Sequence, residues 1–388
     1  MKVAVLFVDD HMRELEGLLR AAEQAGANWD VRTANDAEAA LQSLQVSAAD
    51  VVVSDLRMPG MDGGKLLSLV RERFPSVVRV MLSADAGARG FMRAAAAAHQ
   101  VLSKPCDFAV LKRVIDETLA LQRRLQAPEL VEAMHQVGAL PSLPQISRKL
   151  EDRLQDDYAT LHEIASIVAS DSAIVTRVLQ LANSAYFRRN AEVTDVQSAI
   201  SRLGFELIRS LVLTRELYAQ LPPLPGIQSE VQAMNARATR VAEIATFLAG
   251  KHADPRELLT VAVLCGVGRL LRLLLSVPIP DTLPDTLLGA YLLSLWGLPF
   301  SLVQAVAFAD QPAKLLLHHT PGQALPVAVL IHLARCFEAR VQQPEDALPR
   351  WEAEPRLESA LLPRIDVLQL QAWEESLRLR LQDPANAT

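Results

Sequence analysis

The first third of the chain alternates short apolar runs with segments whose apolar residues recur at helical spacing. Because these runs are nearly continuous, they predict strands buried on both faces, as in a parallel sheet covered by helices. We therefore expect an α/β domain with a doubly wound, five-stranded parallel sheet. The predicted strands are Val3–Val8, Val31–Thr33, Val51–Ser54, Val78–Leu82 and Val101–Leu102.

After Ala127 this alternation stops, and the remaining segments have helical spacing. Thr160 and Asp171 each precede an apolar helical face, as N-cap residues do. Gly204 would end a further helix that follows Thr194. We expect an all-α second domain, with other helices at Glu230–Ala249, Arg256–Leu275, Pro299–Ala309 and Val367–Leu381.

The division between the two parts is expected near the charged helix end Gln122-Arg123-Arg124, because Pro128 follows where a long helix would have to stop. The predicted organisation is an α/β domain at 1–122, a linker helix at 123–135, an all-α domain at 136–335 and a helical extension packed on it at 336–388.

Composition excludes several classes of function. No apolar run approaches the ~18 residues that span a bilayer. The three cysteines, Cys106, Cys265 and Cys336, are scattered and suggest neither a disulfide framework nor a zinc site. A net charge of -6 gives no overall attraction to nucleic acid or anionic membrane, and we interpret Arg188 and Arg189 as a solvated corner. A cytoplasmic protein that binds neither membrane nor nucleic acid is expected.

Polar residues follow four of the predicted strands. Asp9 and Asp10 end the first strand, Asp55 the third and Ser83 the fourth, and Lys104 follows the fifth. The carboxyl ends of parallel strands share one edge of the sheet, so these side chains should meet there. Each acid alone would be a solvated strand end or a helix cap. Together, carboxylates beside one ammonium group suit Mg²⁺ and phosphoryl transfer onto an ionised carboxylate.

Four stretches at these positions resemble the receiver domain of two-component response regulators: VDD at 8–10, DLRMPGMDG at 55–63, Ser83-Ala84 and Lys104-Pro105. The resemblance implies a flavodoxin-like fold. Val101 stands where such domains often carry an aromatic switch residue, so coupling through an aromatic rotamer is not expected.

The same resemblance implies a role for each polar residue. Asp55 would be the phosphoacceptor, and Ser83 and Lys104 would contact the phosphoryl oxygens. Asp10, Asp55 and the backbone carbonyl of Arg57 would bind Mg²⁺, with Asp9 acting through water.

The second part resembles the HDOD domain, a helical signalling module related to the HD phosphohydrolases. The matching stretches are LPSLPQISRKLEDRLQ from Leu140, SDSAIVTRVLQLANSAYF ending at Phe187, QSAISRLGFELIRSLVL from Gln197 and SLWGLPFSLVQAVA from Ser294. Their residues also have structural interpretations. Asn183 and Ser184 would satisfy backbone groups at a helix end, and Trp296 and Phe300 would be core residues.

An HD-type hydrolase needs a His-Asp dipeptide and further His and Asp ligands to hold a metal that activates water. The sequence contains no His-Asp dipeptide, and at its expected place reads Leu264-Cys265-Gly266-Val267-Gly268. The later paired histidines of the HD relatives fall on Ala309 and Asp310. We interpret His318-His319 as a helix-end feature, and we do not expect an enzyme.

These observations predict a response regulator that a cognate histidine kinase or phosphotransfer protein phosphorylates on Asp55. Its non-catalytic HDOD domain would bind a protein partner or form a homodimer. The alternative is a receiver-regulated HD-type phosphodiesterase that acts on a cyclic dinucleotide, and it rests on fold analogy alone.

Overall fold

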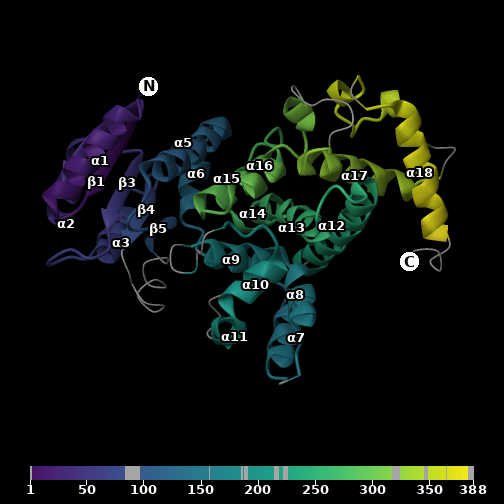
Figure 1. Cartoon of the computed structure of the whole chain (residues 1–388), viewed down its shortest axis with the longest axis horizontal. Helices are drawn as coiled ribbons and strands as arrows, with labels where there is room; N and C mark the ends of the chain where they lie inside the picture. Colours follow the sequence, from purple (N-terminus) through teal and green to yellow (C-terminus); the bar gives the residue numbers. More distant parts are fainter. Residues whose placement is uncertain are drawn as a thin grey trace.

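We describe the fold from a computed structural model of the chain. The structure describes residues 2–83, 97–156, 158–184, 187, 191–213, 218–221, 226–316, 324–344, 348–363 and 365–382. The α/β part lies at one end of the molecule, and the helical part extends from it to helix α18 at the other end (Figure 1).

Five parallel strands form the sheet, in the order β2-β1-β3-β4-β5. This order is the flavodoxin-like form of the doubly wound fold, so the predicted α/β class is confirmed. The strands are β1 (Val3–Val8), β2 (Trp29–Ala34), β3 (Val51–Asp55), β4 (Val78–Ser83) and β5 (Gln100–Ser103), and the helices of this part are α1 (Met12–Gln24), α2 (Ala37–Val46), α3 (Gly63–Arg73) and α5 (Phe108–Leu125).

Burial along the strands explains how well the sequence located them. Strands β3 and β4 are buried at every residue, and the predicted apolar runs match them to within one residue. The edge strand β2 extends beyond the prediction at both ends, because its partly exposed face admits polar residues such as Asp30. A continuous apolar run therefore marks an interior strand better than an edge strand.

The remaining described chain is mostly helical, as predicted, and also contains a short parallel pair of strands, β6 (Pro141–Ser142) and β7 (Ala219–Gln220). None of its described helices is long and apolar enough to cross a membrane. The helices are α6 (Pro128–His135), α7 (Pro144–Leu154), α8 (Leu161–Ala169), α9 (Ser172–Asn183), α10 (Val196–Leu203), α11 (Phe205–Leu213), α12 (Ile227–Ala249), α13 (Pro255–Leu264), α14 (Val267–Leu274), α15 (Asp285–Leu295), α16 (Phe300–Ala307), α17 (Val327–Val341) and α18 (Val367–Gln382), with 3₁₀ turns η1 (Pro312–Leu316), η3 (Trp351–Ala353) and η4 (Ser359–Leu361).

Capping residues set several of these helix ends. Thr160 forms a capping box with Glu163 at the start of α8, and Asp171 accepts hydrogen bonds from the first turn of α9. The cap of α10 is Asp195, one residue after Thr194, and Gly204 ends that helix with φ +81°. The sequence signals for helix ends therefore held to within one residue here.

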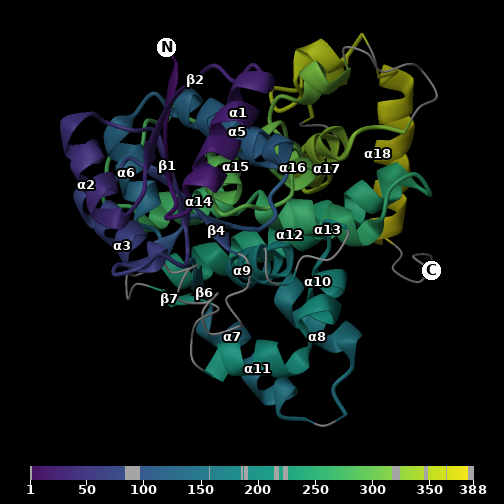
Figure 2. The same ribbon diagram turned by 60° about the vertical axis from the view of Figure 1, so that its left-hand side comes forward.

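The predicted helix Arg256–Leu275 is two helices, α13 and α14, which meet at Cys265 and Gly266. The break lets α14 pack closely against α15, beside which it lies in both ribbon views (Figure 1 and Figure 2). At Gly268 a Cβ atom would clash with the backbone carbonyl of Asp285 at the start of α15, so this approach requires glycine.

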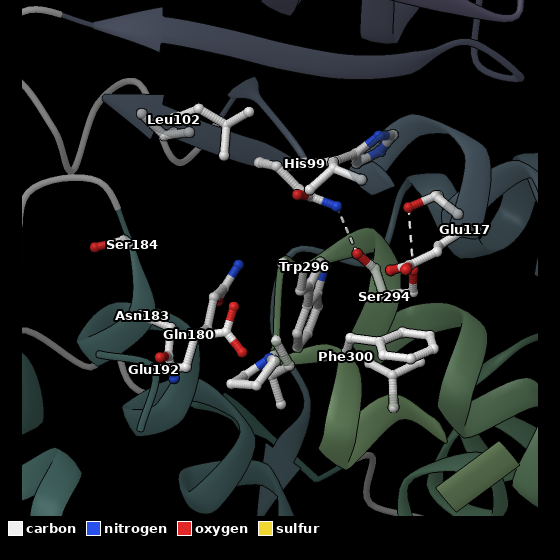
Figure 3. A pocket seen from close by; sticks show the side chains of 18 of the residues that line it. His99, Leu102, Glu117, Gln180, Asn183, Ser184, Glu192, Ser294, Trp296 and Phe300 are labelled. Atoms are coloured by element: carbon white, nitrogen blue, oxygen red, sulfur yellow. Dashed lines mark hydrogen bonds between the residues drawn. The ribbon is translucent and has the colours of Figure 1, made fainter. Parts of the chain in front are cut away.

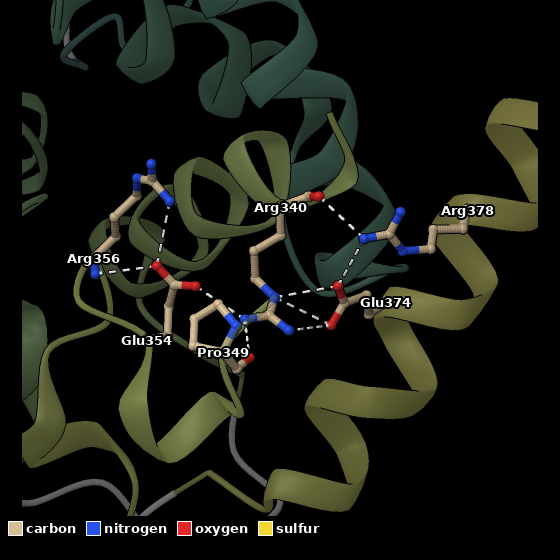
Figure 4. A network of polar contacts seen from close by, with 6 residues as sticks. All are labelled: Arg340, Pro349, Glu354, Arg356, Glu374 and Arg378. Carbon is tan, nitrogen blue, oxygen red and sulfur yellow. Dashed lines mark hydrogen bonds and ion pairs between the residues drawn. The ribbon is translucent and has the colours of Figure 1, made fainter. Parts of the chain in front are cut away.

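A buried arginine fastens the C-terminal segment to α17 (Figure 4). The Arg340 guanidinium is bound by Glu354 at 2.9 Å and by Glu374 of α18 at 3.0 Å. It also lies over the Trp351 ring, 4.1 Å from the ring centroid. All three charged groups are buried, and Arg356 and Arg378 each add a further side-chain contact to a carboxylate, so the group forms a buried polar network.

We expect Arg340→Ala to destabilise the protein by about 3–5 kcal/mol, because it leaves two carboxylates buried without their shared cation. Urea unfolding followed by circular dichroism measures the change. The control is Arg20→Ala, which removes an exposed ion pair with Glu16 and should cost about 0.5 kcal/mol or less. Equal effects of the two substitutions on the free energy of unfolding would contradict this role of the buried Arg340 ion pairs.

Candidate functional site

The polar residues that follow the strands meet at one edge of the sheet, as the sequence predicts. Lys104 lies at the centre of the cluster. Its Nζ atom is 2.5 Å from Asp55 Oδ1 and 2.7 Å from Asp9 Oδ2. Both aspartates are buried, with exposed fractions of 8% and 2%. Strands β1 and β3 and the residue after β5 therefore build a single charged site.

The cluster also contains a third carboxylate that the sequence analysis did not single out. Glu14 Oε2 lies 2.6 Å from Lys104 Nζ. Glu14 is in the first turn of α1, directly after the loop that holds Asp9. The sequence did contain a signal for Glu14, because it is an acidic residue in the first turn of the helix that follows the two acids after β1.

Mutual contacts shift the pKa values of this cluster. Burial opposes the charge on Lys104, but its hydrogen bonds to Asp55, Asp9 and Glu14 raise the pKa of the ammonium group above its ordinary value. Burial likewise favours the neutral form of Asp9, but Lys104 and the His11 backbone N–H lower its pKa below its ordinary value. The pair therefore stays ionised at neutral pH.

The donor set suits a hard divalent cation. The carboxylates of Asp9, Asp55 and Glu14 face one ammonium group, so negative charge is in excess. Asp10 is partly buried, and its Oδ1 lies 3.2 Å from His11 Nδ1, which in turn lies 3.4 Å from Asp9 Oδ1. Ligand atoms of Asp9, His11 and Glu14 lie within 4.8 Å of one another. Oxygen donors in this arrangement fit Mg²⁺.

The loop after β3 fixes the orientation of Asp55. The Arg57 backbone N–H donates to Asp55 Oδ2 at 2.6 Å, and the Ser54 hydroxyl donates to the Asp55 carbonyl at 2.8 Å. Gly63 begins α3 against this carbonyl. A Cβ at Gly63 would clash with the Asp55 carbonyl oxygen and would lie 2.9 Å from Ser54 Oγ. The glycine is therefore needed for the helix to start so close to the strand end.

Ser83 ends β4 and is buried, at the same edge of the sheet. Its carbonyl accepts a hydrogen bond from the Lys104 backbone N–H at 2.8 Å, which ties the chain after β5 to the end of β4. Its motif neighbour Ala84 lies outside the described residues. Ser83 and Lys104 are therefore neighbours through the backbone.

The opposite end of β5 reaches the helical part of the molecule (Figure 3). The Gln100 amide donates to the Ser294 carbonyl on α15 at 2.6 Å. On α5, the Thr118 hydroxyl lies 3.0 Å from the Ser294 hydroxyl. All three residues are buried, so one face of the α/β part is packed against α15.

A small cavity of about 70 Å³ lies in this interface, with residues of both parts in its wall. Leu102 and Glu117 line it from the α/β part, and Trp296 and Asn183 line it from the helical part (Figure 3). Burial raises the pKa of Glu117, and the nearby Glu192 adds to the effect while Arg113 opposes it. The interface thus contains a carboxyl group whose ionisation is opposed by burial.

The sequence interpretations of the helical residues here are partly right. Asn183 satisfies backbone groups as expected, since its amide accepts from the Val193 N–H at 2.8 Å and donates to the Val193 carbonyl at 2.9 Å. Trp296 is buried, but Phe300 is 41% exposed and is not a core residue. Phe300 begins α16 and lines the cavity between the two parts.

A second group of interface residues surrounds a buried arginine on β4. The Arg79 guanidinium donates to the Ala97 carbonyl at 2.9 Å and to the His135 carbonyl at 3.0 Å. Burial, with repulsion from Arg71, lowers its pKa to about 9. His135 Nε2 lies 2.5 Å from the Tyr291 hydroxyl, which connects α6 with α15. Burial and the Arg79 charge lower the pKa of His135 to about 3, so its ring is neutral.

The position at which HD relatives carry their metal ligands is occupied by other chemistry. Arg335 Nη1 donates to Asp310 Oδ1 at 2.6 Å, and the Thr286 hydroxyl donates to Asp310 Oδ2 at 2.5 Å. Burial raises the pKa of the neighbouring Cys265 thiol to about 12. His318-His319 and Arg188-Arg189 lie outside the described residues.

Two family models match the chain. Residues 5–116 match the response regulator receiver domain, and residues 140–278 match the HDOD domain. The first segment coincides with the α/β part, and the second covers α7 to α14, whereas α15, which contacts the α/β part, lies outside both matches.

Curated relatives match over the first half. The chain is 30% identical over 188 residues to the probable transcriptional regulatory protein NarL of Mycobacterium tuberculosis, an alignment that covers 46% of this chain and 86% of the relative. It is 26% identical over 156 residues to the DNA-binding transcriptional regulator NtrC of Salmonella typhimurium, covering 38% of this chain and 32% of that protein.

Solved structures also match this region. The signal receiver domain of an HD domain-containing protein from Pseudomonas fluorescens Pf-5 is 28% identical, with 33% of this chain and 98% of that chain covered and a TM-score of 0.28. Chemotaxis protein CheY4 of Vibrio cholerae is 27% identical, with 30% and 98% covered and a TM-score of 0.28.

The close contact at Gly63 yields a stability prediction. We expect Gly63→Ala to destabilise the protein by about 1–3 kcal/mol, because the new methyl group must displace the end of β3. The matched control is Gly64→Ala in the same helical turn, where the nearest atom to a new Cβ is 3.4 Å away. Alanine there should be neutral or stabilising by up to about 1 kcal/mol. Urea unfolding of both variants checks the difference. An unchanged free energy of unfolding in Gly63→Ala would show that the close approach of α3 to the Asp55 carbonyl does not require glycine.

Proposed function

This chain belongs to the two-component response regulators, with a receiver domain followed by an HDOD domain, and we propose that Asp55 accepts its phosphoryl group. The donor would be a cognate histidine kinase or phosphotransfer protein. The observation that carries this proposal is the convergence of Asp55, Asp9 and Glu14 on the Lys104 ammonium group. In our proposal the receiver covers residues 1–122, and the linker covers 123–135, where the structure has the end of α5 and the separate helix α6 in place of the single predicted helix.

The proposed transfer follows from the contacts of Asp55. An ionised Oδ atom attacks the phosphorus of a phosphohistidine, the P–N bond breaks, and the imidazole keeps the electron pair and takes up a proton. Asp9, Asp10, Asp55 and the backbone carbonyl of Arg57 would hold a Mg²⁺ ion, which neutralises charge on the transferred group. Lys104 would exchange its contact with Asp55 Oδ1 for a phosphoryl oxygen, and Ser83 would donate its hydroxyl to another.

The geometry of β5 supports a route from this site to the HDOD domain. Lys104 follows the last residue of the strand, and Gln100, the first, binds the Ser294 carbonyl. A change in the position of Lys104 therefore acts on the same four-residue strand that contacts α15. With Val101 in place of an aromatic residue, displacement of the strand would transmit the signal. A shift between two domain arrangements requires only a few kcal/mol.

We propose that the HDOD domain acts by binding a protein partner or a second copy of the chain. Asp310 is engaged by Arg335 and Thr286, and the half-buried Cys265 keeps its proton because its pKa is raised. In the described residues, the cluster of metal-capable side chains lies in the receiver. The phosphodiesterase alternative is therefore not favoured.

Phosphorylation can be tested with acetyl phosphate and Mg²⁺, followed by intact-mass spectrometry. We expect wild type to gain the mass of one phosphoryl group and Asp55→Asn to gain none, since an amide cannot act as the nucleophile. The control is Asp62→Asn in the same loop, which caps α3 and should remain reactive. Chelation of the metal should abolish the gain. No gain in wild type, or a gain that survives Asp55→Asn, would refute the proposal.

Coupling can be tested by hydrogen–deuterium exchange of α15 before and after phosphorylation. We expect phosphorylation to change exchange in α15 of wild type and to change it much less in Gln100→Leu. This substitution removes the strand's bond to Ser294 and costs about 1–3 kcal/mol, because the carbonyl is left buried. The control Gln45→Leu lies on the exposed face of α2 and should behave as wild type. An unchanged response in Gln100→Leu would exclude this route.

A further inference from the structure

The HDOD part contains a large open cavity that the proposed function does not use. Its volume is about 790 Å³, which is in the range of sites for small molecules. Helices α12, α13, α14, α15 and α17 contribute to its wall. Its arginines outnumber its carboxylates, five to three. They are Arg237, Arg240, Arg269, Arg335 and Arg356, with Glu230, Asp285 and Glu338.

The carboxylates of this cavity are already engaged by arginines. Glu338 is buried and accepts from both Arg237, at 3.0 Å, and Arg240, at 2.9 Å. Glu230 pairs with Arg269, and Asp285 pairs with Arg272. A metal cation would have to displace these guanidinium groups. Arg335 and Arg356 pair with Asp310 and Glu354, which are not part of the lining. The positive excess therefore lies at Arg237 and Arg240, which share the single carboxylate of Glu338, and it favours an anion.

The arginine side chains retain donors for such an anion. A guanidinium group has five N–H donors in a planar fork. Within the described part of the chain, Arg237 bonds to Glu338 through Nε alone. Arg237, Arg240 and Arg269 are each about half exposed, with values of 48%, 49% and 47%. Their remaining N–H groups are therefore accessible from the cavity.

Asn235 provides an independent indication of a ligand. It lines the cavity from α12 and is only 7% exposed. Its Nδ2 atom is buried and has no hydrogen-bond partner among the described residues. A buried donor without an acceptor is costly, and the surrounding arginines are donors too. An oxygen atom of a bound anion would satisfy it.

Two helix starts lie at the same wall. Gly266, the N-cap of α14, lines the cavity, as do Asp285 and Thr286 in the first turn of α15. The amino end of a helix carries partial positive charge and exposed N–H groups. The start of α14 therefore adds to the attraction for an anion, whereas at the start of α15 the Asp285 carboxylate, paired with Arg272, offsets it.

We propose that this cavity binds a small molecule through a diphosphate group. The arginines come from α12, α14, α17 and the segment before η4, so they span more space than one phosphate occupies. The described lining residues include no aromatic ring on which a nucleobase could stack. Recognition would therefore be directed at the phosphates, through paired guanidinium contacts.

Isothermal titration of the full chain with inorganic pyrophosphate, without divalent cations, tests this proposal. We expect binding at one site per chain. Arg240→Gln and Asn235→Ala should each weaken it by about tenfold or more, since each removes a hydrogen bond to the anion. Arg237 still pairs with Glu338 in Arg240→Gln, so the fold should be kept. If Asn235→Ala unfolds, Arg269→Gln on α14 takes its place.

Two controls locate the site. Arg20→Gln, far from the cavity on α1, should bind as wild type. Lys104→Ala should also bind as wild type, and loss of binding there would place the anion in the receiver and overturn the proposal. Absence of binding, or binding that Arg240→Gln and Arg269→Gln leave unchanged, would also overturn it. A parallel titration with ADP distinguishes a free diphosphate from one carried by a nucleoside, and either result agrees with the diphosphate site.

Discussion

The Lys104 ammonium group is bound by three carboxylates that come from β1, β3 and α1, and the arrangement depends on the parallel sheet. Parallel strands bring their carboxyl ends to one edge, so charged residues distant in the sequence are forced together. Once buried, such carboxylates need a cation, and the chain supplies one at the end of β5. Strand β5 also forms the contact with α15. The charged site at one end of this strand and the packing against α15 at its other end therefore both constrain its position.

Buried charge is handled differently at three places in the molecule. Arg340 is neutralised by two glutamates and fastens the C-terminal segment. Arg79, in contrast, donates to backbone carbonyls beside His99 and His135, whose pKa values are lowered by burial, and its own pKa falls as well. The arginines of the HDOD cavity remain half exposed, with more positive than negative charge. The first arrangement fastens the C-terminal segment, the second ties β4 to α6, and the third leaves guanidinium donors available for a ligand.

The sequence predicted the five strands and the residues at their ends because both depend on local patterns. It missed Glu14 because its contact with Lys104 depends on the direction in which α1 leaves β1. It missed Arg79, His135 and Tyr291 because their contacts exist only after the two domains pack. It placed Phe300 in the core because the sequence does not show whether another element will cover an apolar residue of a helix. Interior strands are thus easier to predict than surfaces between domains.

The bond from Gln100 to α15 ends on a main-chain carbonyl, that of Ser294. A main-chain acceptor is present whatever side chain the position carries, so mutational drift at residue 294 leaves this bond available. The Thr118 contact, which needs the Ser294 hydroxyl, lacks that protection. As such proteins diverge, the Gln100 bond to the residue 294 carbonyl would keep β5 and α15 in place while the Thr118 contact is lost or replaced. The interface between β5 and α15 can therefore tolerate side-chain substitution at residue 294 and remain packed.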